Sequence, residues 1–175
     1  MSFKSLLYDS SRAVIDIGVV TIEGKPELFA DAFNLCKEKY PVSMRAARVV
    51  QLYIEKYPVK ILPILPEVLD ELLITKVDGV KRSFLKILFL SSSIINLEKS
   101  GLLLDKCLFW LMSDKEPIAV RAYCIDILVK FALEEPELKH EIRLAIENLP
   151  FDEYPSLKSR CRKALKALIP TDSRT

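Results

Sequence analysis

The chain has 175 residues, of which 50% are hydrophobic, so it is long and apolar enough to build the core of a domain. Only 4 residues are glycine, which argues against a β-rich fold with many tight turns and favours helices. The formal net charge is +2, so the total charge gives no indication of attraction to nucleic acid or to an anionic membrane.

Cysteine usage and hydropathy point to a soluble protein of the cytoplasm. The four cysteines are too far apart in sequence for a metal knuckle or a redox pair: Cys36, Cys107, Cys124 and Cys161. We expect each to be a small buried apolar residue in a reducing compartment. Asp9 and Asp16 interrupt the N-terminal apolar run, which excludes a signal peptide there. The most apolar stretches, 87–97 and 102–112, are shorter than the ~18 residues needed to span a bilayer.

Prolines divide the chain into segments in which apolar residues recur every three or four positions, as in helices. The predicted helices cover residues 11–23, 26–39, 42–57, 66–75, 78–92, 101–113, 116–133, 136–149 and 154–168. The first is ambiguous, because Ile15, Ile17 and Val19 alternate as in a strand and Gly18 is a poor helix former. We predict a helix there because its neighbours are helices.

Four of the predicted helices begin alike, which indicates an internal repeat. They start at Pro41, Asp78, Pro117 and Pro155. The first three place an arginine just inside the helix, and these arginines are Arg45, Arg82 and Arg121. The fourth has Ser159 at the corresponding place and Arg160 one step later. The unit is therefore a helix pair of about forty residues, the length typical of HEAT and armadillo arrays.

The opening of the second helix in each pair resembles the HEAT family, with Met44-Arg45-Ala46 and Val120-Arg121-Ala122 as the matching residues. Lys81-Arg82-Ser83 departs at its first position. The chain is similar to small bacterial HEAT-like proteins of unknown role. The resemblance implies an all-α, right-handed α-solenoid of about four helix pairs after an N-terminal helical segment. It also implies that the repeated arginines tie adjacent repeats together through carboxylates or carbonyls.

The corresponding domain prediction is one HEAT-like helical repeat domain over residues 1–175. Its repeats are expected to cover roughly residues 26–57, 61–92, 98–133 and 136–168. The basic last helix suits a polar C-terminal cap, because the end of a repeat array needs a polar outer face.

No catalytic, cofactor-binding or metal-binding residues are predicted. His140 is the single histidine, and it lies among charged residues, so we expect it on the surface of a helix. The nucleophile-elbow, zinc, EF-hand and phosphate-loop motifs do not occur in the sequence. Catalysis by carboxylates alone stays open, because acidic residues are plentiful and sequence does not reveal which of them pair in space.

The distribution of charge is the main indication of function. Residues 42–57 and 78–92 each carry two more basic than acidic residues, and 116–133 is balanced. Residues 154–168 contain five basic residues and no acidic residue. Because second helices line the concave face of a solenoid, this face is expected to contact an acidic partner. The predicted contact residues are Arg48, Lys81, Lys86, Lys158, Arg162, Lys163 and Lys166.

Two alternatives limit this interpretation. Residues 132–153 hold seven acidic and two basic residues, and their packing against the last helix would neutralise it. The second alternative concerns residues 102–112, which are apolar on all sides. Such a helix is buried in the core or forms a partner interface, and Trp110 or Phe109 is expected to contribute to the core.

The prediction for function is a non-catalytic protein-binding scaffold that uses the concave face of a short α-solenoid, as a monomer or a homodimer without a membrane. Its protein partner is not identified by any motif. The alternative hypothesis is a nucleic-acid-binding protein connected with DNA repair. Alkylpurine DNA glycosylases are HEAT-like arrays with a basic groove, aromatic side chains and a catalytic carboxylate. The chain resembles them in architecture, but its low net charge and single tryptophan make nucleic acid the less favoured partner.

Overall fold

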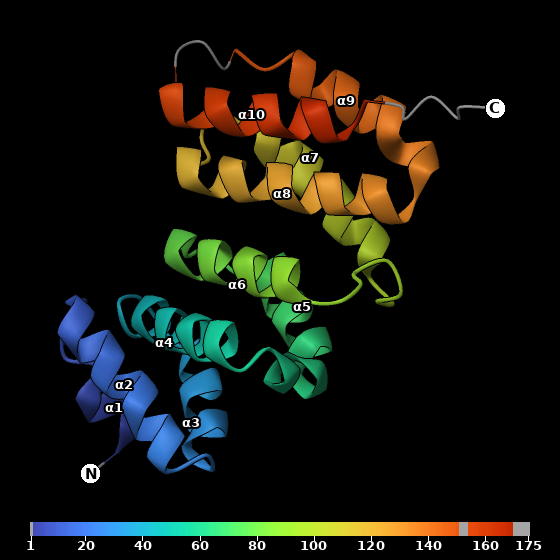
Figure 1. Cartoon of the computed structure of the whole chain (residues 1–175). Coiled ribbons are helices and arrows are strands. Elements are labelled where there is room, and N and C mark those ends of the chain that lie inside the picture. Colours follow the sequence, from blue (N-terminus) through green and yellow to red (C-terminus); the bar gives the residue numbers. More distant parts are fainter. Residues whose placement is uncertain (1, 151–153, 170–175) are drawn as a thin grey trace. The chain divides into compact units, whose positions relative to one another are not determined.

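The computed structural model describes residues 2–150 and 154–169, and within these ranges its regular structure is helical, with no strand (Figure 1). The first six helices are α1 (Phe3–Leu6), α2 (Arg12–Gly24), α3 (Leu28–Leu35), α4 (Val42–Lys56), α5 (Leu65–Ile74) and α6 (Asp78–Leu90). They are followed by α7 (Ser100–Met112), α8 (Ile118–Glu134), α9 (Lys139–Glu147) and α10 (Pro155–Ala167). Two 3₁₀ helices, η1 (Pro58–Ile64) and η2 (Pro136–Leu138), precede α5 and α9.

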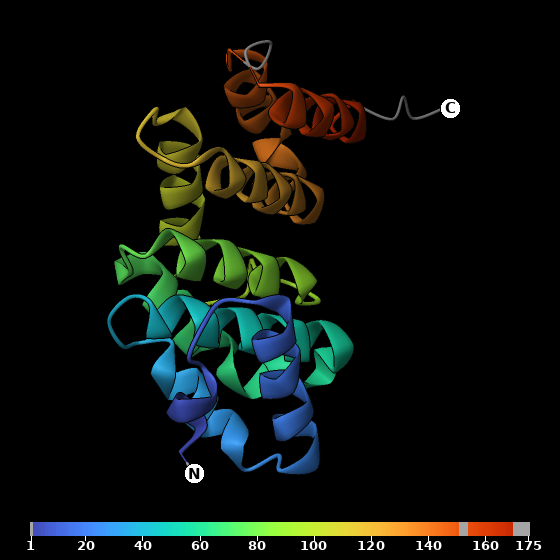
Figure 2. The same cartoon turned by 90° about the vertical axis from the view of Figure 1, so that its left-hand side faces the viewer.

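The chain divides into two compact units, residues 1–92 and residues 93–175, called unit 1 and unit 2 below. In unit 1, α4 packs against both α2 and α6, and Figure 2 shows α4 and α6 side by side. The helix α3 packs on α4, and α5 packs on α6, so they form a second layer. The core lies between these layers, where the Phe33 ring stacks on the Phe84 ring with 6.1 Å between centroids.

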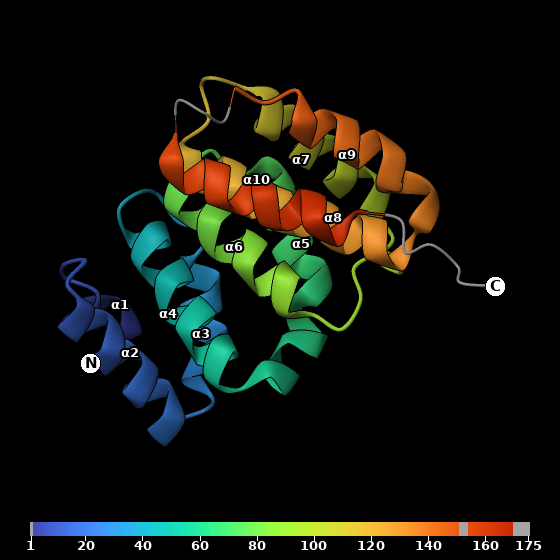
Figure 3. The same cartoon turned by 45° about the horizontal axis from the view of Figure 1, so that its top comes forward.

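Unit 2 repeats this arrangement with two helix pairs. The helix α7 packs on α8, and α9 packs on both α8 and α10. The second helices α8 and α10 also contact each other directly (Figure 3). Leu128 and Phe131 of α8 and Cys161 of α10 are buried in this unit. Each unit therefore has one layer that contains first helices and one that contains second helices.

The ambiguous first segment is helical, as predicted. Val14, Ile15, Val19 and Ile22 are buried, which is the three- and four-residue spacing of one helix face. Ile17, which gave the strand-like alternation, is 50% exposed. The hydroxyl of Ser11 accepts a hydrogen bond from the backbone N–H of Val14 at 3.3 Å and caps the helix.

The predicted helix boundaries are close to those in the structure, with three differences. The helix α3 covers Leu28–Leu35 and is shorter than the predicted segment 26–39. The segment 136–149 begins with the 3₁₀ turn η2 before α9 starts. The helices α1 and η1 were not predicted, because a single turn and a proline-containing 3₁₀ segment are too short and irregular to give a periodic pattern.

The apolar helix α7 has one buried and one exposed side. Leu103, Cys107, Trp110 and Leu111 are buried, which confirms the core prediction for Trp110. Phe109 is 66% exposed, so it does not contribute to the core. No helix in the described ranges has the length and apolar character needed to cross a membrane.

Candidate binding surface

The fourth residue of each second helix carries a basic side chain that is at least half-buried. Counted from the first residues of α4, α6, α8 and α10, this position is occupied by Arg45, Lys81, Arg121 and Lys158. The predicted series Arg45, Arg82, Arg121 and Ser159 was therefore wrong by one residue in the second and fourth members. The difference arises because Pro41 and Pro117 precede the first residues of α4 and α8, whereas Asp78 and Pro155 are themselves the first residues of α6 and α10.

Two members of this series bind backbone carbonyl groups, as the resemblance implied. Arg45 donates from Nη1 to the carbonyl oxygens of Leu7 at 2.9 Å and Tyr8 at 2.8 Å. Arg121, which is 2% exposed, donates from Nε to the carbonyl of Leu111 at 2.9 Å. Arg45 of α4 thereby binds the segment that follows α1, outside its own pair α3–α4. Arg121 of α8 binds the last turn of α7, within its own pair.

The two lysines of this series differ in burial, and one of them, Lys81, is too buried to be a contact residue. Lys81 is 7% exposed, and its Nζ lies 3.5 Å from a carboxylate oxygen of Asp78. It therefore cannot present its charge to a partner, which corrects the prediction. Arg82 is exposed instead, and it has no hydrogen-bond or ion-pair partner among the residues that the structure describes. Lys158 is half-buried.

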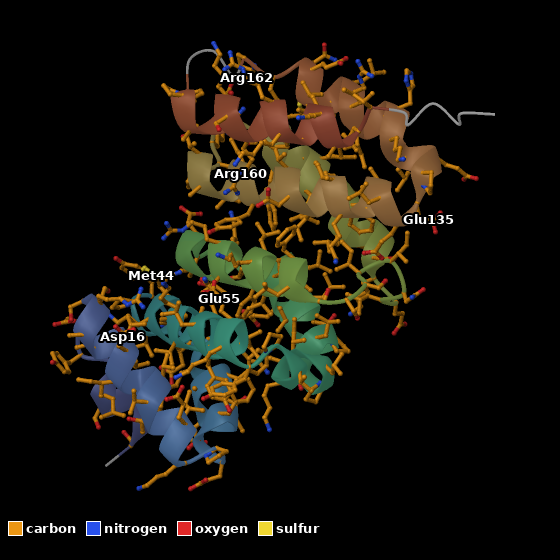
Figure 4. All side chains as sticks on the ribbon, viewed as in Figure 1. Asp16, Met44, Glu55, Glu135, Arg160 and Arg162 are labelled. Carbon is orange, nitrogen blue, oxygen red and sulfur yellow. The ribbon has the colours of Figure 1, made fainter. Side chains whose placement is uncertain are left out.

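In unit 1, the predicted contact residues Arg48 and Lys86 belong to a polar network between α4 and α6. Arg48 donates from Nη1 to Oε1 of Gln51 at 3.0 Å, and Gln51 donates to Oε1 of Glu55 at 2.7 Å. The Nζ of Lys86 lies 3.1 Å from the same Glu55 oxygen, and Figure 4 shows Glu55 near the seam of these helices. Both cations therefore already have partners within the unit.

The network sets the ionisation of Glu55. Burial by itself raises the pKa of this carboxyl, because the charged form is desolvated. The hydrogen bond from Gln51 and the ammonium of Lys86 act in the opposite direction and together lower the pKa below its ordinary value. Glu55 is therefore an ionised partner for these cations and is not suited to act as a proton donor.

A second polar cluster joins α8 to α10 in unit 2. Arg160 donates from Nη1 to Oδ2 of Asp126 at 2.8 Å, and its guanidinium lies 5.2 Å from the centre of the Tyr123 ring. Nothing in the local sequence pattern predicts this cluster, because Asp126 and Arg160 are 34 positions apart. The cluster fixes the side chains of both second helices along their shared seam.

The remaining predicted residues, Arg162, Lys163 and Lys166, all lie exposed on α10. None of them has a hydrogen-bond or ion-pair partner within the described ranges. Figure 4 shows Arg162 on the side of α10 away from α8, whereas Arg160 points toward α8. Among the predicted contact residues, those that are exposed and have no hydrogen-bond or ion-pair partner within the described ranges therefore lie on this helix.

The acidic segment does not neutralise α10 through ion pairs in the described part of the chain. Glu134 lies 3.6 Å from Nζ of Lys130, and Glu147 lies 2.7 Å from Nε of Arg143. These acidic residues therefore pair within their own helices. Among the described residues, no ion pair supports the alternative that residues 132–153 neutralise the last helix. Asp152 and Glu153, which also belong to the acidic segment, lie outside the described residues.

Other residues considered for chemistry are arranged as structural residues. His140 lies exposed on α9, as predicted. All four cysteines belong to the described ranges and are buried without a disulfide, and burial raises the pKa of the Cys36 and Cys161 thiols. In the same ranges, no group of three or more histidine, cysteine, aspartate or glutamate side chains is placed to hold a metal ion.

The repeated helix pairs agree with a comparison to known families. The family model of the HEAT repeat domain matches residues 4–168. The chain belongs to the HEAT repeat family. This match confirms the all-α solenoid class of the HEAT repeat protein. No curated protein and no solved structure matches the chain.

Proposed function

We propose that this HEAT repeat protein is a non-catalytic scaffold that binds a protein partner against its second helices. HEAT repeats generally serve as protein-interaction scaffolds. The observation that carries the proposal is the cross-linking of polar side chains on the second helices of each unit. These side chains belong to the networks of Glu55 with Lys86 and of Asp126 with Arg160.

Such networks favour binding because they reduce the entropy lost when a complex forms. A long cationic side chain that moves freely in the unbound protein loses roughly 0.5–1.5 kcal/mol of rotamer entropy when a partner immobilises it. A side chain that is already held by a neighbouring helix loses less. The seams α4–α6 and α8–α10 therefore present prearranged polar groups to a partner.

The proposal also includes the compartment, the oligomeric state and the domain organisation of the protein. We place the protein in a reducing compartment, the cytoplasm, a choice supported by four buried cysteine thiols. It acts as a monomer or a homodimer, and residues 1–175 form one domain with four main helix pairs. Nucleic acid is the alternative partner, and the exposed cations of α10 are the observation in its favour.

The proposal is tested by comparing the two layers in one binding assay. A partner is recovered by cross-linking to the full chain in cell extract, purified, and titrated into the full chain by calorimetry. Arg82→Glu changes an exposed residue of the second helix α6, and Lys60→Glu makes the same charge change on η1, in the other layer.

We expect Arg82→Glu, or the double change Glu55→Gln with Asp126→Asn, to weaken binding by about tenfold or more, because these variants alter the second-helix surface. Lys60→Glu should leave the affinity unchanged. The proposal is wrong if the recovered partner binds all second-helix variants like the wild type but is lost with Lys60→Glu, or if purification yields no protein that binds.

A further inference from the structure

The exposed face of α10 combines long cations with small side chains. Arg162, Lys163 and Lys166 are exposed, and so are Ser156, Ser159 and Ala167. At 100° of rotation per residue, these positions occupy the same side of the helix, opposite the buried residues Leu157, Cys161 and Ala164. Small side chains between the cations leave room for another backbone to approach closely.

Among the residues that the structure describes, no ion pair compensates the positive charge of this face. The sequence of α10 contains no acidic residue. The carboxylate that α8 directs to α10, that of Asp126, is already bonded to Arg160. Glu134 and Glu147 pair within α8 and α9, respectively. The cations Arg162, Lys163 and Lys166, which have no ion-pair partner within the described ranges, therefore attract an anionic partner.

We propose, as a refinement that rests on the proposed function, that this face of α10 is the docking site for an acidic helix of the partner protein. Arg162 and Lys166 are four residues apart, and Lys163 and Lys166 are three apart. Arg162 and Lys163 are therefore separated from Lys166 by about 6 Å and 4.5 Å along the axis. A partner helix with carboxylates at the same three- and four-residue spacing repeats this distance and can pair with all three cations.

The composition of α10 favours an acidic peptide over nucleic acid. Binding of single strands relies on exposed aromatic rings that stack on bases, and α10 has no aromatic residue. The Tyr123 ring on α8 is covered by the Arg160 guanidinium, which lies 5.2 Å from the ring centre. A duplex would be held only through a few phosphate contacts, which give weak binding at physiological salt.

The test uses the full chain and defined probes. The main probe is a fluorescent, alanine-based helical peptide of about 15 residues that carries glutamate at three- and four-residue spacing. A second peptide has the same composition with its glutamates clustered, and a third probe is a 20-base-pair DNA duplex. Binding is measured by fluorescence anisotropy at about 150 mM salt.

The variant R162E/K163E/K166E reverses the cations of α10. The matched control K25E/K60E/K115E makes the same change in net charge at three exposed lysines outside α10. The neutral variant R162Q/K163Q/K166Q avoids the risk that charge reversal disturbs the helix, and circular dichroism checks the fold of all three.

We expect the spaced peptide to bind the wild type and the control with the same affinity. Both α10 variants should bind it at least about tenfold more weakly. Equal weakening by the control, equal binding of the clustered peptide, or tighter binding of the duplex overturns the inference. If the purified partner loses affinity with Arg82→Glu but not with R162E/K163E/K166E, the proposed function stands and only the docking site is wrong.

Discussion

Arg121 is a cation with almost no contact with solvent, since only 2% of the residue is exposed. Its Nε donates to the carbonyl oxygen of Leu111, and its guanidinium carbon lies 5.9 Å from the centre of the Tyr154 ring. A buried charge is tolerated only when it is hydrogen-bonded or paired. Arg121 therefore links the end of α7, the start of α8 and the residue that precedes α10.

We predict that Arg121→Ala lowers the free energy of unfolding by about 1–3 kcal/mol, because the carbonyl of Leu111 loses a charged donor in a buried place. Urea denaturation followed by circular dichroism measures the change. Arg82→Ala is the comparison, because Arg82 is exposed, and it should change stability by no more than about 0.5 kcal/mol. Equal effects of the two substitutions would contradict a structural role for Arg121.

Gly79 is needed for the close approach of α6 to α4. A Cβ atom at this position would lie 2.2 Å from Cγ and 3.1 Å from Cβ of Met44. Cγ is near the backbone end of the methionine side chain, so the clash cannot be relieved by moving only the flexible tip. A larger residue here has to separate the helices or displace Met44 from a favoured rotamer.

We predict that Gly79→Ala destabilises unit 1 by about 1–3 kcal/mol, even though alanine is the better helix former. Gly24→Ala is a control in the same unit, because no atom lies within 4 Å of the added Cβ. That change should leave stability equal or raise it by less than about 1 kcal/mol. Thermal melts of both variants test the contrast, and a Gly79→Ala protein as stable as the Gly24→Ala protein would show that no steric restriction exists.

At the scale of elements, Glu134 joins the end of α8 to the segment that precedes α7. Its carboxylate accepts hydrogen bonds from Oγ of Ser93 at 2.6 Å, from the N–H of Ile94 at 3.2 Å and from the N–H of Ile95 at 3.3 Å. Burial raises the pKa of Glu134, but these hydrogen bonds and the charge of Lys130 outweigh it, so the pKa lies below the ordinary value of 4.5.

This direction predicts how stability depends on pH. Because the folded-state pKa of Glu134 is lower than the unfolded value, its contribution is fully present above about pH 4.5 and is lost as pH falls through the folded-state pKa. Urea midpoints of the wild type and Glu134→Gln should therefore differ at neutral pH and converge in acid. A difference that stays constant down to about pH 3 would exclude this role.

The helix α7 illustrates what an apolar pattern leaves undecided. The helix has so few polar positions that its sequence does not distinguish a buried side from an exposed one. The structure buries Trp110 against its neighbours and places Nζ of Lys106 5.5 Å from the Trp110 ring centre. Leu102 and Met112 are more than half exposed on the other side, together with Phe109.

At the scale of the whole molecule, the small net charge hides a local concentration of cations. The formal charge is +2, but three exposed basic residues lie within one turn and a half of α10. Such an arrangement attracts polyanions weakly and in a salt-dependent way. The number of released counterions is limited by the number of cations that reach the phosphates together.

We predict that the full chain binds duplex DNA only at low salt, with a slope of about −3 or shallower for log affinity against log salt concentration. Fluorescence anisotropy between about 20 and 200 mM salt measures the slope, and R162E/K163E/K166E should abolish most of it. Sub-micromolar affinity at about 150 mM salt is far beyond the non-specific range and would make nucleic acid the favoured partner.

The sequence predicted the helices and the length of the repeat well because both depend on local interactions. Proline positions and apolar spacing act within a few residues, so segments such as 42–57 and 78–92 match α4 and α6 closely. The resemblance to the HEAT family, and not these local rules, implied that Arg45 and Arg121 bind carbonyl groups. The sequence pattern predicted Arg82 as the member of the series in α6, but the structure buries Lys81 and exposes Arg82. A shift of one residue turns a helix position by 100°, which is enough to exchange the exposed side for the buried one.

By itself, then, the sequence determined the all-α class, the paired helices and the basic character of α10. Only the tertiary structure decided which charges remain available. Asp126 meets Arg160 across 34 positions, and Glu134 meets Ser93 across 41. Partners this far apart come together only when neighbouring helices pack, and packing depends on the whole set of buried side chains. Composition alone would pair the acidic residues 132–153 with the cations of α10. In the described parts of the fold, these two groups form no ion pair with each other.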